Sequence, residues 1–558
     1  MKIILSCRFV LANCLRSSSQ SPIRYFSSKE LPKFYATPIF YVNSVPHIGH
    51  LYTTVYADAL HRFTRLCLPN NDVTTTIFST GTDEHGLKIQ KSAQSKNINL
   101  IEYCNQISSK FRQLFNDAET SYTHFIRTTD DQHKKVVQNL WKILMDKGFI
   151  YKSKYCGYYS VNDETFVPDN LITTNSNGEK ISIESGHKLE WYEEENYVFR
   201  LSQLQERVID WIDNHLIMKP ENYHQSLKAD IRNIKNFKDL SISRSKTRLQ
   251  WGIEVPGDDS QLIYVWFDAL ANYLTVTGYP NKQPVIWPPC HVIGKDIIKF
   301  HCIYWPAFLL AAELPLPERI YCHSHWLYDR QKMSKSLGNV VDPFECIEQF
   351  TADGIRYFLL KEGTPHSDSN FNLDAVKTCL NAELADTFGN LLNRCTSEKL
   401  NPKQSYPFVS LDEIQEYLPE SLDTINFIET LSNECFESYL DGNFHIGITN
   451  VMQCLRSING LFNLIQPWKF VQKHPHNDND NDLNQKRLKC LLFLSLESIR
   501  ISAILLNPIV PNISKSIFEK LNISQEFCQW KFAKINNSKQ QNDNRISSKK
   551  LIIFSKLT

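Results

Sequence analysis

An extended apolar run at 34–40 leads through a short turn into a long helical pattern at 48–66, and this order restricts the fold more than any other stretch. The apolar side chains of the second segment recur at helical spacing: Ile48, Leu51, Val55, Ala59, Phe63 and Leu66. A strand that leads into a helix is the repeating unit of parallel α/β folds. Because the N–H groups and dipole of a helix N-terminus favour an anion, the sequence predicts an anion-binding turn near 46–50.

Two histidines stand at this predicted helix start. His47 and His50 are three residues apart, so both side chains can reach the same bound group. Gly49 leaves room for a flat base or a phosphate to approach the backbone. Taken alone, however, the pattern fits a capped structural helix equally well.

A basic loop far downstream gives the histidine turn a chemical partner. Residues 332–336 read Lys-Met-Ser-Lys-Ser and are followed by Gly338. Two ammonium groups among small hydroxyl residues are typical of a mobile loop that neutralises a pyrophosphate leaving group. An ordinary basic surface loop has the same composition, so neither motif is decisive without the other.

Polar residues follow two further predicted strands. The apolar run 73–78 ends in the polar segment 79–86, which contains Asp83 and His85, and the run 291–293 leads into Gly294 and Asp296. Ligands of open α/β sheets bind beyond the carboxyl ends of strands. We therefore expect these side chains at the site, although a helix cap is the alternative for Asp83.

Aromatic residues lie at helical spacing in the second half of the predicted sheet. Trp266, Ala269 and Tyr273 share one face, and Ile297 and His301 lie four residues apart on another. Such stripes usually belong to a core. Because both follow expected strand ends, they also fit an apolar pocket for a small hydrophobic amino acid.

The C-terminal part has a helical pattern with exposed polar residues. Asn390 and Arg394 lie one turn apart on a face that apolar residues avoid, and Trp468 follows a proline at the end of another helix. Exposed amide and guanidinium groups beside an aromatic ring suit the recognition of unstacked RNA bases. Each is alternatively a solvated residue or a packing tryptophan.

The pattern divides the chain into successive parts. Strand and helix signals alternate through 29–148, short aromatic stretches with polar turns indicate an inserted, partly β domain at 149–263, and the α/β pattern then resumes. The predicted parts are a leader at 1–28, the two α/β halves at 29–148 and 264–325 around the insert, a linking region at 326–370, and a helical domain at 371–558.

Residues 1–28 carry four basic residues, several serines and no acid, which is typical of a mitochondrial transit peptide rather than a secretory signal. A disordered basic arm is the alternative. Loss of these four charges would change the formal charge from +1 to −3. Any contact with nucleic acid must therefore come from a local basic patch.

Cysteine spacing and hydropathy exclude two classes of site. The 15 cysteines include no Cys-x-x-Cys pair, and the insert offers only Cys156, so we expect neither zinc nor a disulfide framework. The longest apolar runs, such as 303–312, are shorter than the roughly 20 residues that a membrane span needs. We therefore expect a soluble protein that does not interact with membranes.

Several of these motifs together resemble one family. The matching segments are 37–43, 79–86, 264–268, 294–297 and the loop 332–336, with Asn390, Arg394 and Trp468. They are similar to the class I aminoacyl-tRNA synthetases, and most of all to the mitochondrial, zinc-less methionyl-tRNA synthetases, over about 33–470. The resemblance implies an α/β Rossmann-like nucleotide-binding fold with an inserted connective-peptide domain, followed by a helical-bundle anticodon-binding domain.

The resemblance also implies a reaction and its residues. Methionine and ATP, as its Mg²⁺ complex, would give methionyl-adenylate and pyrophosphate, and the methionyl group would then pass to tRNA(Met) in the mitochondrial matrix. A monomer is expected. The implied catalytic residues are His47, His50, Lys332 and Lys335, joined at the ATP site by Gly49, Gly294, Asp296 and Ser334. The implied methionine site is Ile39, Tyr41, Asp83, Trp266, Ala269, Tyr273, Ile297 and His301, and the implied anticodon site is Asn390, Arg394 and Trp468.

Three alternatives remain at this point. Isoleucyl, valyl and leucyl enzymes share both motifs but usually carry a larger editing insert, and the cysteinyl enzyme needs a zinc-bound pocket. A nucleotidylyltransferase uses a similar histidine turn, but the lysine loop and long helical part argue against it. The third alternative is a synthetase-like RNA-binding protein without catalysis, against which both intact motifs argue.

Overall fold

A computed structural model of the chain describes most of the sequence. The described residues are 31–68, 75–161, 165–167, 169–183, 185–234, 237–247, 249–280, 286–333, 339–470, 478–535 and 545–557. The predicted transit peptide, 1–28, lies outside these residues, as do Ser334 and Lys335 of the lysine loop.

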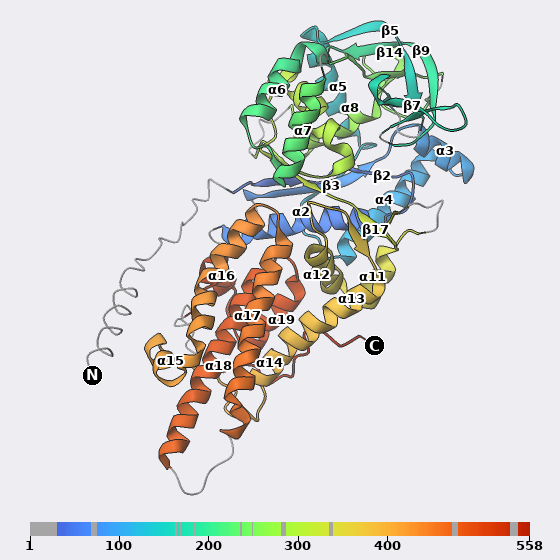
Figure 1. Ribbon diagram of the computed structural model, residues 1–558. Coiled ribbons are helices and arrows are strands. Elements are labelled where there is room, and N and C mark those ends of the chain that lie inside the picture. Colours follow the sequence, from blue (N-terminus) through green and yellow to red (C-terminus); the bar gives the residue numbers. More distant parts are fainter. Residues whose placement is uncertain are drawn as a thin grey trace.

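A parallel sheet forms the centre of the molecule (Figure 1). Within the described residues it has seven strands in the order β10-β16-β15-β1-β3-β2, with β4 paired to β3, and every pairing is parallel. Their bounds are β1 Phe34–Ala36, β2 Phe40–Tyr41, β3 Ile77–Asp83, β4 His124–Arg127, β10 Met218–Lys219, β15 Cys290–Gly294 and β16 Arg319–His323. The predicted Rossmann-like class is confirmed.

Helices cover both faces of this sheet. In Figure 1, α2 (Ile48–Cys67) runs below it, between the sheet and the helical part of the chain, and α5 and α8 lie above. The other helical elements of the α/β part are α3 Leu87–Ser95, α4 Leu100–Asp117, α5 Asp131–Asp146, α8 Val265–Leu270, α9 Asn272–Val276, η5 Lys295–Ile297, η6 Phe300–Tyr304 and α10 Trp305–Ala312. The predicted helix at 48–66 is confirmed, with its apolar stripe buried.

One predicted strand lies further along the chain than expected. The sequence pattern indicated a strand at 73–78, of which 73 and 74 lie outside the described residues, and β3 spans Ile77–Asp83. Position 81 in this strand has no room for a side chain. A Cβ on Gly81 would lie 2.0 Å from the carbonyl oxygen of Ile126 on the neighbouring strand β4. The glycine therefore permits close strand pairing, and Asp83 ends the strand.

The segment 149–263, predicted to be an inserted and partly β domain, contains both strands and helices. Its two long strands, β5 and β9, pair in an antiparallel sheet, whereas β10 from the same segment joins the central sheet. The bounds are β5 Ile150–Ser160, β6 Thr165–Phe166, η3 Asp169–Leu171, β7 Ile172–Thr174, β8 Lys180–Ser182, β9 Leu189–Phe199, η4 Leu201–Leu204, α6 Gln205–Asn214, α7 Glu221–Asn233, β11 Leu240–Ser241, β12 Ser243–Ser245, β13 Glu254–Val255 and β14 Asp258–Ile263.

A small sheet and two helices connect the α/β part to the helical part. The hairpin β17–β18 carries the start of the lysine loop, and β17 pairs in parallel with β19. The bounds are β17 Trp326–Tyr328, β18 Gln331–Lys332, α11 Pro343–Phe350, α12 Ala352–Glu362 and β19 Ser369–Phe371.

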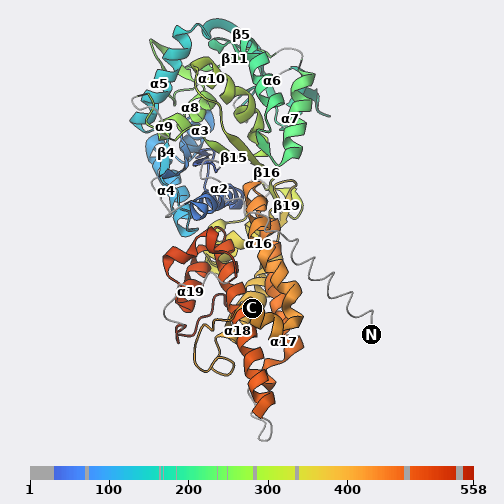
Figure 2. The same cartoon turned by 90° about the vertical axis from the view of Figure 1, so that its left-hand side faces the viewer.

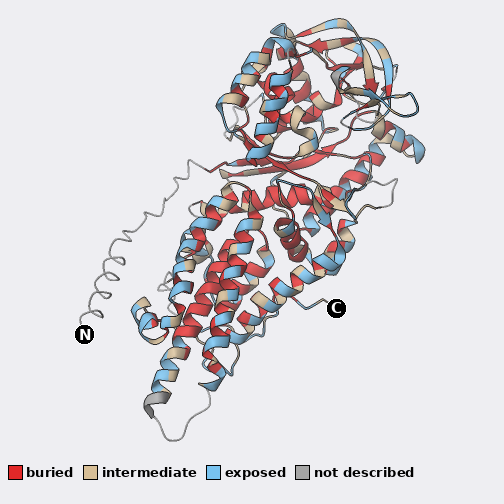
Figure 3. Cartoon of the chain, viewed as in Figure 1, coloured by how far each residue is buried: buried red, intermediate tan, exposed pale blue. Residues whose placement is uncertain are grey.

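The helical part extends away from the sheet as an elongated bundle (Figure 2). Its elements are α13 Leu373–Leu380, the π-helix η8 Asn381–Gly389, α14 Asn390–Cys395, α15 Leu411–Tyr417, η9 Pro419–Ser421, α16 Leu422–Leu440, α17 Phe444–Ile465, η10 Pro467–Lys469, α18 Asp478–Leu506, α19 Pro511–Leu521, η11 Gln525–Cys528 and η12 Trp530–Phe532. The long α16, α17 and α18 pack together, and their buried faces appear red in Figure 3. No helix of the described residues is both long and apolar enough to cross a bilayer.

Candidate functional site

A cavity of about 150 Å³ opens at the carboxyl end of the central sheet. The structure gathers around it seven of the eight residues that the sequence implied for a methionine site: Ile39, Tyr41, Asp83, Trp266, Ala269, Tyr273 and His301. Five further residues lie in the wall: Leu270, which shares the helical spacing of Trp266, Ala269 and Tyr273 in the sequence, and four that sequence reasoning missed, Pro38, Lys88, Val265 and Asn272. The wall thus combines aromatic side chains with one carboxylate and one ammonium group.

The charged part of the cavity comes from β3 and the start of α3. Asp83 is the last residue of β3 and is 7% exposed, so its carboxylate is held at the cavity wall. Lys88 lies in the first turn of α3, with its Nζ 5.9 Å from the ring centre of Tyr41. The two opposite charges line the same cavity, which suits a substrate carrying both an ammonium and a carboxylate.

A buried hydrogen-bonded pair forms the inner wall. The hydroxyl of Tyr273 lies 2.8 Å from Nε2 of His301, whose Nδ1 lies 3.0 Å from the carbonyl oxygen of Ile297. A carbonyl only accepts, so Nδ1 carries the proton and Nε2 accepts from Tyr273. Burial lowers the pKa of His301 to about 4, so the imidazole is neutral near pH 7.

Ile297 is the one implied pocket residue that does not line this cavity. The expectation assumed a continuous α-helix in which 297 and 301 share a face. Instead, the 3-10 turn η5 ends at Ile297 and the π-helix η6 begins at Phe300, so the spacing changes between them. Ile297 supplies its carbonyl to His301, and Phe300 stacks on Trp266 with ring centres 3.6 Å apart.

Below this wall, Asp268 is buried between two histidines. Its Oδ2 lies 2.6 Å from Nδ1 of His85, and its Oδ1 lies 2.7 Å from Nε2 of His133. Burial acts to raise the pKa of Asp268, but the attraction and hydrogen bonds of the two histidines outweigh it, and the pKa is lowered. Asp268 is therefore an ionised anchor that connects α8 to α5 and to the loop after β3.

The histidine turn lies at the start of α2, as predicted, but two of its backbone N–H groups donate to the histidine rings. The N–H of Gly49 donates to Nδ1 of His47, and the N–H of His47 donates to Nδ1 of His50, each over 3.1 Å. Both Nδ1 atoms accept, so each ring carries its proton on Nε2 when neutral. A Cβ at Gly49 would lie 2.9 Å from the His47 ring, so this glycine makes room for the histidine. An anion here would be met by imidazole N–H groups.

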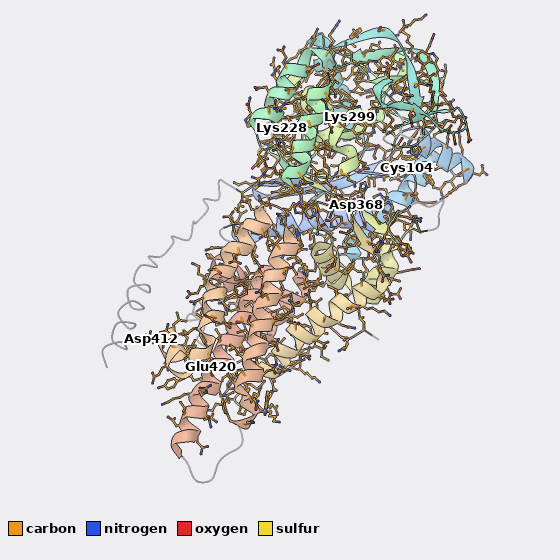
Figure 4. All side chains as sticks on the ribbon, in the orientation of Figure 1. Cys104, Lys228, Lys299, Asp368, Asp412 and Glu420 are labelled. Carbon is orange, nitrogen blue, oxygen red and sulfur yellow. The ribbon has the colours of Figure 1, made fainter. Side chains whose placement is uncertain are left out.

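The turn after β15 lies beside the start of the linking region. Asp296 accepts from Nε2 of His325 over 3.1 Å, and Lys295 pairs with Asp368 over 2.7 Å. Asp368 is labelled in Figure 4 at the junction of the α/β and helical parts. A Cβ at Gly294 would lie 2.7 Å from Oδ1 of Asp296, so the bare backbone lets Asp296 fold back. Lys332 is the last residue of β18, and its side chain lies outside the described part of the structure.

A second cavity, of about 550 Å³ and open to solvent, lies in the helical part. It brings together the three residues implied for anticodon recognition with four others, and its wall consists of Asn390, Asn393, Arg394, Ser397, Lys399, Leu400 and Trp468. Asn390 and Arg394 are exposed, as expected, and Trp468 is 39% exposed. Amide, cationic and aromatic groups thus face one hollow.

The described part of the insert omits 162–164, 168, 184, 235–236 and 248. Within that part of the chain no group of three or more His, Cys, Asp or Glu side chains is arranged to hold a metal ion. The single cysteine of the insert, Cys156, is exposed on β5.

Comparison with known proteins places this geometry in a family. Residues 33–396 match the model described as tRNA synthetases class I (M). The mitochondrial methionine–tRNA ligase of Mus musculus is 43% identical over 528 residues, covering 92% of this chain and 88% of the relative. The probable mitochondrial enzyme of Schizosaccharomyces pombe is 42% identical over 515 residues, covering 89% and 91%.

Solved structures of methionyl-tRNA synthetases have the same fold as this chain. The methionyl-tRNA synthetase of Mycobacterium tuberculosis bound by methionyl-adenylate superposes with a TM-score of 0.84 at 30% identity, covering 94% of this chain and 100% of that one. The apo form of the same enzyme superposes with a TM-score of 0.77 at 28% identity, covering 94% and 97%.

Proposed function

We propose how the two cavities work from the premise that this chain belongs to the class I tRNA synthetases and, among them, to the methionyl-tRNA synthetases. The chain activates methionine with ATP to methionyl-adenylate, releases pyrophosphate, and transfers methionine to tRNA(Met) for mitochondrial translation. The roles of individual residues are inferred from their geometry in the following paragraphs.

The cavity at the sheet is the proposed methionine site. Asp83 binds the substrate ammonium, and the aromatic walls enclose the thioether, because sulfur–aromatic contacts are favourable. Neutral His301 and the Tyr273 hydroxyl, which donates to it, meet the sulfur without a charge. The observation that carries this proposal is the convergence of Asp83, Trp266 and His301 on one cavity of about 150 Å³.

The histidine turn, the turn after β15 and the lysine loop form the proposed ATP site. The imidazole N–H groups of His47 and His50 contact phosphates, and Gly294 and Asp296 hold the nucleoside. Lys332, Ser334 and Lys335 neutralise the charge that develops as pyrophosphate leaves. The methionine carboxylate attacks the α-phosphate itself, so no covalent nucleophile is required.

Mg²⁺ enters this proposal with ATP. Magnesium is usually bound through substrate phosphates, water and one or two carboxylates rather than by a protein cage. We propose no structural zinc, because the insert contributes a lone cysteine where a site needs about four close ligands. The enzyme is mitochondrial, as its relatives are; within the organelle we place it in the matrix, acting as a monomer.

The open cavity of the helical part is the proposed anticodon site. Unstacked bases can stack on an indole and accept hydrogen bonds from a guanidinium or an amide. Asn390, Arg394 and Trp468 offer these three groups around one hollow. Replacing Trp468 by alanine should leave adenylate formation intact and weaken charging of tRNA, whereas equal loss of both would make Trp468 a structural residue.

Amino-acid-dependent ATP–pyrophosphate exchange tests the methionine pocket. The chain starting at residue 29 would be assayed with each of the twenty amino acids. Exchange with methionine alone is expected, and exchange with another amino acid would refute the pocket residues while keeping the class. A folded protein that binds tRNA but exchanges with none would be a non-catalytic RNA-binding protein.

A further inference from the structure

We propose that Asn459 is a positioning residue for tRNA recognition, holding the guanidinium of Arg394 at the open cavity. The inference rests on the proposed reading of the anticodon by Arg394. Asn459 lies on α17, outside the cavity wall, and no sequence motif pointed to it. Its three hydrogen bonds carry the argument.

Both amide protons of Asn459 are directed to backbone carbonyls. Its Nδ2 donates to the carbonyl of Leu455, one turn earlier on α17, and to the carbonyl of Thr387 on η8, each over 3.1 Å. Its Oδ1 accepts from an NH1 proton of Arg394 over 3.2 Å. The side chain is half-buried, so these contacts are partly screened from water.

This arrangement fixes which end of the amide faces Arg394. The reversed amide would set its oxygen against two carbonyl oxygens and its NH₂ group against a guanidinium that can only donate. All three contacts would then be repulsive. The acceptor oxygen of Asn459 is therefore directed at Arg394 by the backbone of two separate helices.

The consequence is a restrained cation in an exposed position. Arg394 is exposed, and a long side chain of this kind loses conformational freedom when it binds a ligand. The hydrogen bond to Asn459 uses one of the five guanidinium N–H donors and restricts the side chain in advance, leaving the others for an RNA base or phosphate.

Asn459 also connects the two segments that build the cavity. Thr387 is on η8, which ends at Gly389 immediately before Asn390, and α17 leads at its far end into the turn that carries Trp468. A single amide therefore ties the segment bearing Asn390 and Arg394 to the helix that positions the indole.

Steady-state charging of a tRNA(Met) transcript by the Asn459→Ala variant tests the proposal. We expect kcat/KM for tRNA to fall about tenfold, mostly through KM, because Arg394 is no longer restrained. ATP–pyrophosphate exchange without tRNA should not change. Asn450→Ala is the matched control, since this asparagine lies on the same helix but donates to Glu434, and its charging should equal that of the wild type.

The double variant separates positioning from a structural role. If Asn459 acts through Arg394, the Arg394→Ala/Asn459→Ala enzyme should charge tRNA no worse than Arg394→Ala alone. Additive losses, or unchanged charging by Asn459→Ala, would overturn the positioning role while leaving the anticodon proposal intact. If the Arg394→Ala enzyme charges tRNA normally, both the positioning role of Asn459 and the anticodon role of Arg394 are overturned. If the alanine variant is unstable, Asn459→Ser replaces it in these assays, because the serine hydroxyl can still donate to the Leu455 carbonyl.

Discussion

The hydroxyl of Tyr273 donates a hydrogen bond of 2.8 Å to Nε2 of His301. This pair sets the chemical character of the inner pocket wall. The proton of the phenol is committed to the imidazole, and the imidazole is neutral because burial lowers its pKa to about 4. The wall therefore presents aromatic surface and satisfied polar atoms to the ligand, which suits a thioether better than a charged or strongly polar side chain.

Tyr273→Phe should reveal the value of this hydrogen bond. Without the hydroxyl, Nε2 of a fully buried imidazole loses its partner, which should destabilise the protein by about 1–3 kcal/mol. The KM for methionine in pyrophosphate exchange should rise more than kcat falls, since the pocket and not the phosphate site is altered. An unchanged KM with lowered stability would restrict Tyr273 to a structural role.

The depressed pKa of His301 predicts a pH dependence of stability. An unfolded histidine has a pKa near 6.5, so between pH 6.5 and about 4 the unfolded chain binds a proton that the folded chain does not. The free energy of unfolding should therefore fall as the pH drops through this window, by about 3 kcal/mol for this residue. Denaturant titrations of wild type and His301→Gln should show a difference at pH 7 that shrinks by pH 4.5; a constant difference would contradict the neutral imidazole.

Sequence reasoning located much of this pocket because its signals are local. Asp83 ends a strand, and Trp266, Ala269 and Tyr273 lie at short helical spacing, so each could be assigned to the carboxyl edge of a parallel sheet. The same spacing placed Ile297 in the pocket, and Ile297 is not among the residues that line this cavity. A four-residue spacing implies one face only in an α-helix, and here the backbone passes from a 3-10 turn into a π-helix.

Other contributors carry no local signal. His133 reaches Asp268 from α5, and Asn459 reaches Arg394 from α17. Isolated histidines and asparagines on amphipathic helices are usually solvated or capping residues, so only the tertiary fold shows what they contact. Lys88 was likewise an ordinary surface lysine in the sequence until α3 placed it in the cavity wall.

Asp268→Asn should disrupt the buried anchor beneath the pocket. The amide cannot supply the negative charge that two histidines share, and an NH₂ group would face one of their N–H donors. A buried polar group that loses its hydrogen-bond partner costs about 1–3 kcal/mol, and more where a charge is involved, so a loss of about 3 kcal/mol is expected by denaturant unfolding. Gln261→Ala, in the neighbouring β14, removes a buried polar side chain without charge and should cost less; equal losses would argue against an ionised Asp268.

Lys335→Ala tests the proposed catalytic loop. If its ammonium acts only as pyrophosphate leaves, the rate of methionine-dependent exchange should fall by about two to three orders of magnitude while methionine binding is retained. Equilibrium binding of methionine and single-turnover adenylate formation separate these effects. Lys403→Ala, an exposed lysine of the helical part, is the control. Unchanged exchange would show that the catalytic loop is misplaced.

The C-terminal segment packs against α12 of the linking region and against η8 of the helical part, which leads to a final prediction. Phe554 is 8% exposed and contacts Gly354 of α12, and the backbone of Leu557 exchanges two hydrogen bonds with the Asn381 amide at the start of η8. Phe554→Ala should therefore cost about 3 kcal/mol of stability through the cavity it leaves. Because η8 leads directly into Asn390, charging of tRNA should fall more than pyrophosphate exchange. Ile552→Ala, in the same segment but 57% exposed, should change neither by a measurable amount. Equal effects of the two substitutions would mean that the segment does not hold η8 in place.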